Sequence, residues 1–395
     1  MLMNNLPFKA ADILIPKGNN DSHTKFAVVA CDQFTSQPEY WSEADKIAGD
    51  DYSSLRLTLP EIYLEGDISG RIESINANMQ KYLDDDIFNE YKDAMVYVER
   101  ELPDGSVRRG LIGAVDLPEY DFRPEKKAKI RATEGTVLER IPPRVKIRRD
   151  AALELPHVMM LVDDPQRTVI EPLENMKGEC LYDFPLMLGG GQLKGFLVNS
   201  DAQKQILGAL EAFNVGENPL IFAVGDGNHS LATAKACYEL TPNELSRYAL
   251  VEVVNIHDEA LVFEPIYRVL FGVNPQQLFD EIKAKIDCGE GEEVEFISAD
   301  CCGKFYTDGF PVGSLQDFLD DYIKRNPAVK IDYIHGEDVV RRLAAGENCA
   351  GFLYGAINKG ELFNIIRRDG VLPRKAFSMG EAASKRYYME SRKIK

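Results

Sequence analysis

The stretch IFAVGDGNHSLATAKACYE, residues 221–239, combines an apolar run, two glycines around an aspartate, one histidine and an alanine-rich helix start. Its residues up to Val224 are continuously apolar, as in a strand that is buried on both faces. Leu231, Ala234 and Tyr238 then follow a helical period. The sequence therefore predicts a buried strand, a glycine-rich turn and a helix, in that order.

The turn consists of Gly225, Asp226, Gly227 and Asn228. Where a strand leads into a helix, backbone N–H groups and the positive helix end point at one spot, which suits a phosphate. The two glycines allow a close approach of the backbone or a positive φ. Asp226 fits beside a phosphate if Mg²⁺ lies between them or if the carboxylate contacts a hydroxyl. His229, in the first helical turn, can donate a hydrogen bond to a phosphate oxygen.

An alternative interpretation needs no ligand. In it Asp226 or Asn228 caps the helix of an ordinary strand-to-helix turn, and His229 is half-buried. A GxG without a third glycine is weak evidence for a dinucleotide site, and no GxxxxGK[ST] motif occurs. These residues alone leave both interpretations open.

Composition excludes several classes of protein. The 395 residues suggest two or three domains, and 45% hydrophobic with 28% charged residues is typical of globular proteins. No apolar run approaches the ~20 residues that span a bilayer, and residues 1–10 lack signal-peptide features, so we expect a cytoplasmic protein without a membrane partner.

The net charge of −18 argues against nucleic acid as a partner. Cysteine and histidine spacings indicate neither disulfides nor a transition-metal site.

The positive charges concentrate in two segments. Residues 123–149 hold ten Lys and Arg against three Glu, and residues 374–395 hold seven against two. Two basic segments in an acidic protein can line one pocket for an anionic ligand. They can also be two solvated faces, the interpretation that charge counting alone favours.

Hydrophobic patterning predicts helices and strands along the whole chain. Hairpins are indicated across the turns at 103–105 and 189–191, since extended residues flank both. Ser200 is predicted as the N-cap of a helix, with Gln203 completing a capping box, and Thr241 as the N-cap of a short helix. Further strands are predicted at 26–34, 54–65, 156–164, 248–258, 349–357 and 362–368, and further helices at 70–85, 275–286, 315–325 and 337–345.

The chain resembles a bacterial and archaeal family known as domain of unknown function 1015. The blocks that carry this resemblance, in order, are ACDQFTSQPEYW, LRLTLPE, IRATEGTVLER, FAVGDGNHSLATA, VVNIHDEALVFEPIYRVL and LPRKAFSMGEA. They span nearly the full length. The family name itself implies no activity.

The turn is also similar to the Asp-Gly-His-His-Arg motif in the nucleotide-binding core shared by ParB partition proteins, sulfiredoxins and free-serine kinases. Asp226, Gly227 and His229 match that motif, while Asn228 replaces the first histidine and Ser230 the arginine. Without that arginine the site lacks a bidentate phosphate donor. The resemblance implies an α/β fold with a ParB/sulfiredoxin-like core at 121–272, an N-terminal α/β region at 1–120, and a C-terminal α/β region with a basic tail at 273–395.

The same resemblance assigns roles to residues. Catalysis would fall to Glu134 as general base, together with Asp226 and His229, and Asp226 would also hold the metal. A carboxylate among many arginines has a lowered pKa, so Glu134 is a poor base unless the substrate neutralises them, and an ion-paired structural Glu134 stays open. Phosphate binding would fall to Gly225, Gly227, Asn228, Ser230, Arg131, Arg140 and Arg144.

Four weaker candidates complete the predicted site. Asp32 follows a predicted strand and can reach a cleft, but a strand-end turn explains it as well. Arg268 matches a family position whose neighbours differ here. Arg374 and Lys375 match a family block and can close over phosphates, or can be solvated charges.

The resemblance implies a kinase that uses ATP or ADP with Mg²⁺ to phosphorylate a small-metabolite hydroxyl, with free L-serine as the implied substrate. Two alternatives remain: a non-catalytic nucleotide-binding switch that controls self-association, and a phosphatase or other hydrolase of a phosphorylated amino acid. The sequence leaves the formation of a homo-oligomer open.

Overall fold

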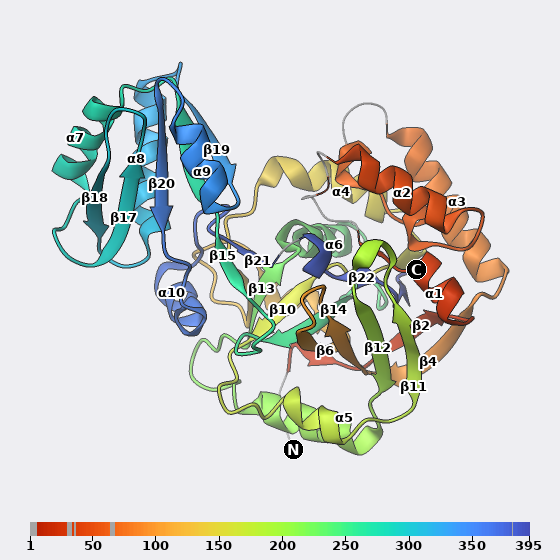
Figure 1. Ribbon diagram of the computed structural model, residues 1–395. Coiled ribbons are helices and arrows are strands. Elements are labelled where there is room, and N and C mark those ends of the chain that lie inside the picture. Colours follow the sequence, from red (N-terminus) through yellow and green to blue (C-terminus); the bar gives the residue numbers. More distant parts are fainter. Residues whose placement is uncertain (1–5, 30–33, 35–36, 64–67, 381) are drawn as a thin grey trace. The chain divides into compact units, whose positions relative to one another are not determined.

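The computed structural model describes residues 6–29, 34, 37–63, 68–380 and 382–395. The chain divides into two compact units (Figure 1). Unit 1 comprises Met1–Leu261 and Gly380–Lys395, and unit 2 comprises Val262–Met379. Unit 2 is thus an insertion into the chain of unit 1. The three regions expected from sequence, 1–120, 121–272 and 273–395, stay a prediction.

A large mixed sheet forms the centre of unit 1. Its order is β11-β12-β5-β6-β14-β10-β13-β8-β7, with β1 added beside β6. The β10–β14, β13–β8 and β7–β8 pairs are parallel, and the others are antiparallel. The prediction of a mixed α/β fold is therefore confirmed. The strands are β1 (Phe8–Lys9), β5 (Val96–Glu101), β6 (Val107–Asp116), β7 (Tyr120–Asp121), β8 (Ile130–Ala132), β10 (Met159–Val162), β11 (Cys180–Pro185), β12 (Gln192–Leu197), β13 (Phe222–Asp226) and β14 (Tyr248–Asn255).

Both faces of this sheet are covered by other elements. Successive side chains of a strand therefore belong alternately to two apolar clusters, one on each face. On β5, Val96 and Val98 belong to one apolar cluster, whereas Tyr97 belongs to the other. The first cluster packs against the N-terminal helices and the C-terminal segment, and the second against α5 and α6. The helices of unit 1 are α1 (Asn20–Phe26), α2 (Pro38–Ala48), α3 (Ser69–Asp84), α4 (Ile141–Arg148), α5 (Ser200–Glu211) and α6 (Asn228–Leu240).

Both predicted hairpins are confirmed. β5 pairs with β6, and β11 pairs with β12, in antiparallel register. The second turn contains glycines because of close approach: a Cβ on Gly191 would lie 2.2 Å from the Glu101 carbonyl oxygen, and one on Gly190 would lie 2.4 Å from the Tyr387 hydroxyl. Glycine is therefore required at both positions, because a side chain would collide with these neighbouring atoms.

The C-terminal segment of the chain returns to unit 1 and is buried there. β22 (Tyr387–Tyr388) pairs with β3 (Val28–Val29), and β23 (Arg392–Lys393) pairs with β9 (Leu153–Glu154). Glu390 has no exposed surface. Residues 385–392 of the predicted basic tail are therefore buried in unit 1, whereas residues 374–379 belong to unit 2 and include the exposed Arg374 and Lys375. A further pair, β2 (Ala11–Pro16) with β4 (Phe88–Ala94), lies at the N-terminal side.

Unit 2 is built on an antiparallel sheet of order β18-β17-β20-β16-β19. Helix α9 packs on β16 and β20, while α8 packs on β17 and β18. The three helices predicted in this region are confirmed as α7, α8 and α9. The elements are β15 (Phe263–Pro265), β16 (Tyr267–Phe271), α7 (Pro275–Lys285), β17 (Glu292–Ile297), β18 (Gly303–Thr307), α8 (Pro311–Arg325), β19 (Lys330–Ile334), α9 (Glu337–Ala344), β20 (Cys349–Tyr354), α10 (Leu362–Asp369) and β21 (Phe377–Met379).

Two predicted strands are wrong. Residues 362–368 form helix α10, because Leu362, Phe363 and Ile366 lie on one buried helical face. Residues 54–63 contain two short 3₁₀ turns, η2 (Ser54–Arg56) and η3 (Glu61–Tyr63). Of the strand predicted at 26–34, the described residues contain only β3.

Two predicted helix starts also differ. Asn199 caps α5, accepting hydrogen bonds from the N–H groups of Asp201 at 3.1 Å and Ala202 at 2.9 Å, so Ser200 is the first helical residue. After Thr241 the chain forms turns, in which the Asn243 side chain accepts the Ser246 N–H at 2.8 Å. In neither unit does a described helix combine the length and apolar character needed to cross a membrane.

Candidate functional site

The predicted strand and helix are confirmed as β13 and α6; of the predicted turn residues, Gly225 and Asp226 end the strand, Asn228 begins the helix and Gly227 lies between them. Gly227 begins the helix in a left-handed conformation, with φ of 84°. A Cβ there would lie 3.0 Å from the Val158 Cα and 3.2 Å from the His157 ring. The position therefore requires glycine for its backbone conformation and for the close approach of residues 157–158.

Asp226 is the charged residue of this turn. Its Oδ1 accepts the Gly227 N–H at 2.8 Å, and its Oδ2 lies 3.3 Å from Nζ of Lys385. Burial raises the pKa of Asp226, but Lys385 and His157 lower it more, and the net pKa lies below the ordinary value. The carboxylate is therefore ionised at neutral pH.

In the structure neither Asp226 nor Asn228 caps helix α6 with its side chain, which the alternative interpretation expected. Asp226 accepts the N–H of Gly227, the cap residue itself, rather than one inside the helix. Oδ1 of Asn228 is buried and has no hydrogen-bond partner among the described residues. A buried amide oxygen without a donor is costly, so this position suits a water, a ligand hydroxyl or a cation.

The C-terminal segment supplies residues that the sequence did not single out. Lys385 has a side chain only 11% exposed, beside Asp226. The Tyr388 hydroxyl lies 3.1 Å from Nδ1 of His157, the ring next to Gly227. The only sequence signal for these residues was the excess of positive charge after residue 374.

The loop that contains Glu134 is held at one end by strand β13 and at the other by His229 of helix α6. β8 runs parallel to β13, and Oγ1 of Thr133 donates to the Val224 carbonyl at 2.7 Å. Further on, the Val137 N–H donates to Nε2 of His229 at 3.2 Å, so the proton of a neutral His229 ring is on Nδ1. The structure thus brings the loop of Glu134 to Asp226 and His229.

A mostly apolar cavity of about 210 Å³ begins beside the first turn of α6. Ser230, His157 and Tyr388 line it, as does Arg144 on the neighbouring helix α4. Of the three predicted phosphate-binding arginines, only Arg144 lines this cavity. Arg140 is exposed at the start of α4, where its carbonyl accepts a hydrogen bond of 3.2 Å from Arg144.

Arg131 is not brought to the turn. Its Nε donates to the Ala128 carbonyl at 2.9 Å and its Nη2 to the Asn218 carbonyl at 3.4 Å. Asn218 precedes β13, whereas Asp226 ends it, so the guanidinium lies at the opposite end of the strand. Its buried side chain holds backbone segments together there.

The weaker candidates lie in unit 2 or outside the described residues. Arg268 lies in unit 2 and is fully buried, donating to Gln316 Oε1 at 2.9 Å and to the Lys375 carbonyl at 3.0 Å. Its guanidinium therefore fixes the backbone of the block that contains Arg374 and Lys375, whose side chains lie near the Tyr333 ring. Asp32 lies outside the described residues.

The turn offers few side chains that could ligate a metal ion. Within the described ranges, no three His, Cys, Asp or Glu side chains form a cluster that could hold a metal ion. Asp226 is a single carboxylate with an ammonium on one oxygen. Mg²⁺ is commonly bound by one or two carboxylates plus substrate phosphates, so it fits here only by sharing Asp226 with Lys385.

Comparisons with known proteins place the chain in a family and beside several structures. A family model described as "Protein of unknown function (DUF1015)" matches residues 7–338. No curated protein matches the chain in sequence. Three similar solved structures are free serine kinase in complex with AMP (TM-score 0.41, 10% identity, 71% of this chain and 91% of that chain), a mutant of free serine kinase in complex with ADP (0.42, 11%, 73% and 93%) and SbnI with C-terminal truncation from Staphylococcus aureus (0.40, 9%, 70% and 85%).

Proposed function

We propose a function for this chain, which belongs to the DUF1015 family: it binds ATP or ADP at the Gly-Asp-Gly turn and phosphorylates the hydroxyl of a small metabolite. The observation that carries the proposal is the pairing of Asp226 with Lys385 where α6 begins. Residues 121–272 would then form a ParB/sulfiredoxin-like nucleotide-binding core. Free L-serine is the first acceptor to test.

Phosphate binding at the turn follows from three features. The first N–H groups of a helix lack helical acceptors and carry partial positive charge. Gly227 lets the backbone turn sharply into that helix. Lys385 supplies a cation beside Asp226, which would compensate for the arginine that Ser230 replaces, and Arg144 supplies another along the adjacent cavity.

In the transfer step, the acceptor oxygen attacks the terminal phosphorus of the nucleotide. The bond from that phosphorus to the bridging oxygen breaks, and ADP leaves from ATP, or AMP from ADP. The acceptor's proton passes to Glu134, whose loop is held by β13 and His229. Lys385 stabilises charge on the phosphoryl oxygens, and Asp226 holds Lys385 in position.

Asp226 would hold Mg²⁺, which would supply further neutralisation of the phosphate charge. His229, with Nε2 occupied by the Val137 N–H, would donate from Nδ1 to a phosphate oxygen. These side chains position and stabilise the reacting groups. Such positioning is the main source of rate in phosphoryl transfer.

A product search tests the proposal. Purified protein is incubated with ATP or ADP, Mg²⁺ and L-serine or a mixture of amino acids, and phosphorylated products are sought by mass spectrometry. A phosphorylated metabolite that requires the nucleotide supports the kinase. Nucleotide binding without product or hydrolysis would replace it with the non-catalytic switch, and phosphate release from phosphoserine without nucleotide would replace it with the hydrolase.

A further inference from the structure

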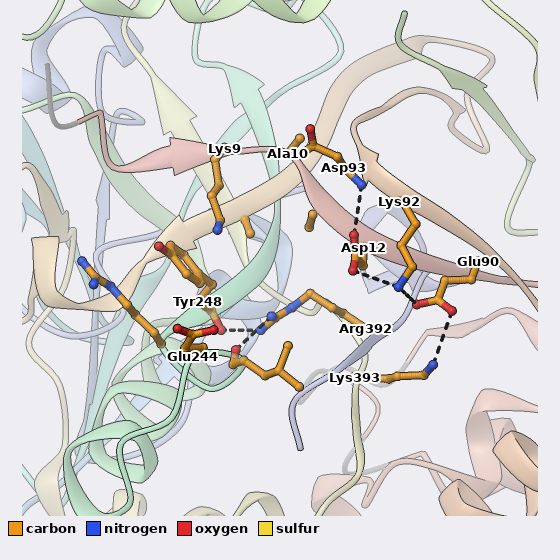
Figure 2. A pocket seen from close by; sticks show the side chains of 14 residues that line it. Lys9, Ala10, Asp12, Glu90, Lys92, Asp93, Glu244, Tyr248, Arg392 and Lys393 are labelled. Carbon is orange, nitrogen blue, oxygen red and sulfur yellow. Dashed lines mark hydrogen bonds and ion pairs between the residues drawn. The ribbon is translucent and has the colours of Figure 1, made fainter. Parts of the chain in front are cut away.

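A second cavity of unit 1, of about 600 Å³, shares no lining residue with the cavity at α6 (Figure 2). Small-molecule sites typically measure about 300–1,000 Å³. Its walls come from β1, β2, β4, the start of β14 and β23, segments far apart in the sequence. The cavity is large enough for a metabolite, and the proposed kinase chemistry does not use it.

One wall of this cavity is fixed by two arginines around Tyr248. Arg392 is nearly buried; its Nε donates to Glu154 at 2.7 Å, and its other nitrogens donate to the carbonyls of Leu245 and Tyr248. Arg247 makes two bonds of 2.8 Å to the carboxylate of Asp116. Both guanidinium charges are therefore compensated, and the loop between them is held in place.

The far wall is a chain of surface charges that neutralise one another. Lys92 lies 3.1 Å from Asp12 and also pairs with Glu90, and Lys393 lies 3.4 Å from Glu90 (Figure 2). Lys92, Arg392 and the Asp93 N–H together hold the pKa of Asp12 below its ordinary value, the N–H having the largest effect. These groups offer little net charge to a ligand.

Two charged groups at the Tyr248 end of the cavity, unlike those of the far wall, form no ion pair among the described residues. Nζ of Lys9 lies 3.5 Å from the centroid of the Tyr248 ring, and in the described part of the chain no carboxylate pairs with it. Glu244 lines the same end and has no cation partner among the described residues. The cation–π contact of an exposed lysine contributes only about 0.5–1 kcal/mol, so a ligand carboxylate can compete for the ammonium.

We propose that this cavity binds a small zwitterion, an amino acid, with its carboxylate on Lys9 and its ammonium on Glu244. Among the described residues, the Tyr248 end of the cavity offers one uncompensated charge of each sign, Lys9 and Glu244, which favours a ligand that carries both. A polyphosphate would meet Glu244 with a like charge, and a polyamine would meet Lys9 in the same way. The site is independent of the proposed catalytic turn.

The experiment measures binding to the full chain by calorimetry. The probes are glycine, L-alanine, L-leucine and L-glutamine, tested one at a time, with acetate and methylamine as single-charge controls; L-serine is left out because it is the proposed acceptor. At least one zwitterion should bind saturably, and Lys9→Gln and Glu244→Gln should each weaken it about tenfold, the effect of one charge-assisted hydrogen bond. Both side chains are at the surface of the cavity, so the variants should fold normally.

Lys46→Gln is the matched control, since Lys46 lies on α2 outside the cavity and pairs there with Glu43. It should leave binding unchanged, as should Lys385→Ala at the catalytic turn. The proposal is overturned if no zwitterion binds, if acetate or methylamine binds as tightly, or if both cavity variants bind like the wild type. A failure of kinase activity would leave these results unaffected.

Discussion

The ammonium of Lys385 lies 3.3 Å from Oδ2 of Asp226, so residues that flank unit 2 in the chain meet at the turn before α6. The pair sits at a helix N-terminus, whose partial positive charge adds to that of the lysine. An anion that contacts this spot would meet the N–H groups and the ammonium together.

Removing the lysine should weaken nucleotide binding. We expect Lys385→Ala to raise the Kd for ADP about tenfold or more, since a hydrogen bond to a charged group contributes about 1.5–3 kcal/mol. Lys385→Arg should retain much of the affinity. Lys204→Ala, on the exposed face of α5, serves as the control, and titration calorimetry is the measurement. An unchanged Kd in Lys385→Ala would remove the lysine from the site.

Neutralising the aspartate should stop turnover without unfolding the protein. Asp226→Asn keeps an oxygen that can accept the Gly227 N–H but loses the charge that holds Lys385 and binds a cation. Product formation should disappear while the circular dichroism spectrum stays that of the wild type. Normal turnover in this variant would contradict the assigned role.

Gly227→Ala should destabilise unit 1. Its φ of 84° and the 3.0 Å contact of an added Cβ with the Val158 backbone both act against alanine, at a cost of about 1–3 kcal/mol. Gly208→Ala is the matched control, because a Cβ there meets nothing within 4 Å in helix α5 and should stabilise by about 0.5–1 kcal/mol. Urea unfolding of the two variants should shift in opposite directions.

Glu252→Gln should be the most destabilising of these substitutions. The Glu252 side chain is 2% exposed, and its carboxylate lies 2.7 Å from Arg386 and 3.6 Å from Arg108. Removing one partner of a buried ion pair costs about 3–5 kcal/mol. Glu43→Gln, on the surface of α2, should cost less than about 1 kcal/mol. A small shift in the urea midpoint for Glu252→Gln would show that the pair is dispensable.

Stability should fall in acid. Burial raises the pKa values of Glu154 and Glu252, but their arginine partners lower them more, so both lie below the ordinary value. Between the lowered folded pKa and the ordinary value, about 4.3, the unfolded state binds more protons, so stability is lost as pH falls through that window. Thermal unfolding of wild type should show this loss, and Glu252→Gln should show a smaller one.

Local patterns predicted the strand, the turn and the helix at residues 221–239 because burial and helical period agree there. The same reasoning failed at 362–368, where a short apolar run fits a strand or a helix equally well. The segment forms a helix because Leu362, Phe363 and Ile366 then lie on one face and are buried together. Short apolar runs carry too little periodicity to make that choice.

The site was predictable only where its residues are close in sequence. Asp226 and His229 share one turn, so the pattern found them. Lys385 and Tyr388 come to the turn from a distant segment, and nothing in their local sequence distinguishes them from other residues of a basic stretch. Arg131 was predicted at the site but does not reach it. Its strand β8 lies beside β13, but its guanidinium lies at the end of β13 away from the turn.

The insertion of unit 2 between Asp226 and Lys385 sets an order for assembly during synthesis. The ribosome makes the whole of Val262–Met379 before the segment that carries Lys385. Strands β3 and β9 must therefore wait for their partners β22 and β23 until unit 2 has been translated. Such long-range closure is slow, so the edges of these strands stay unpaired in the nascent chain until then.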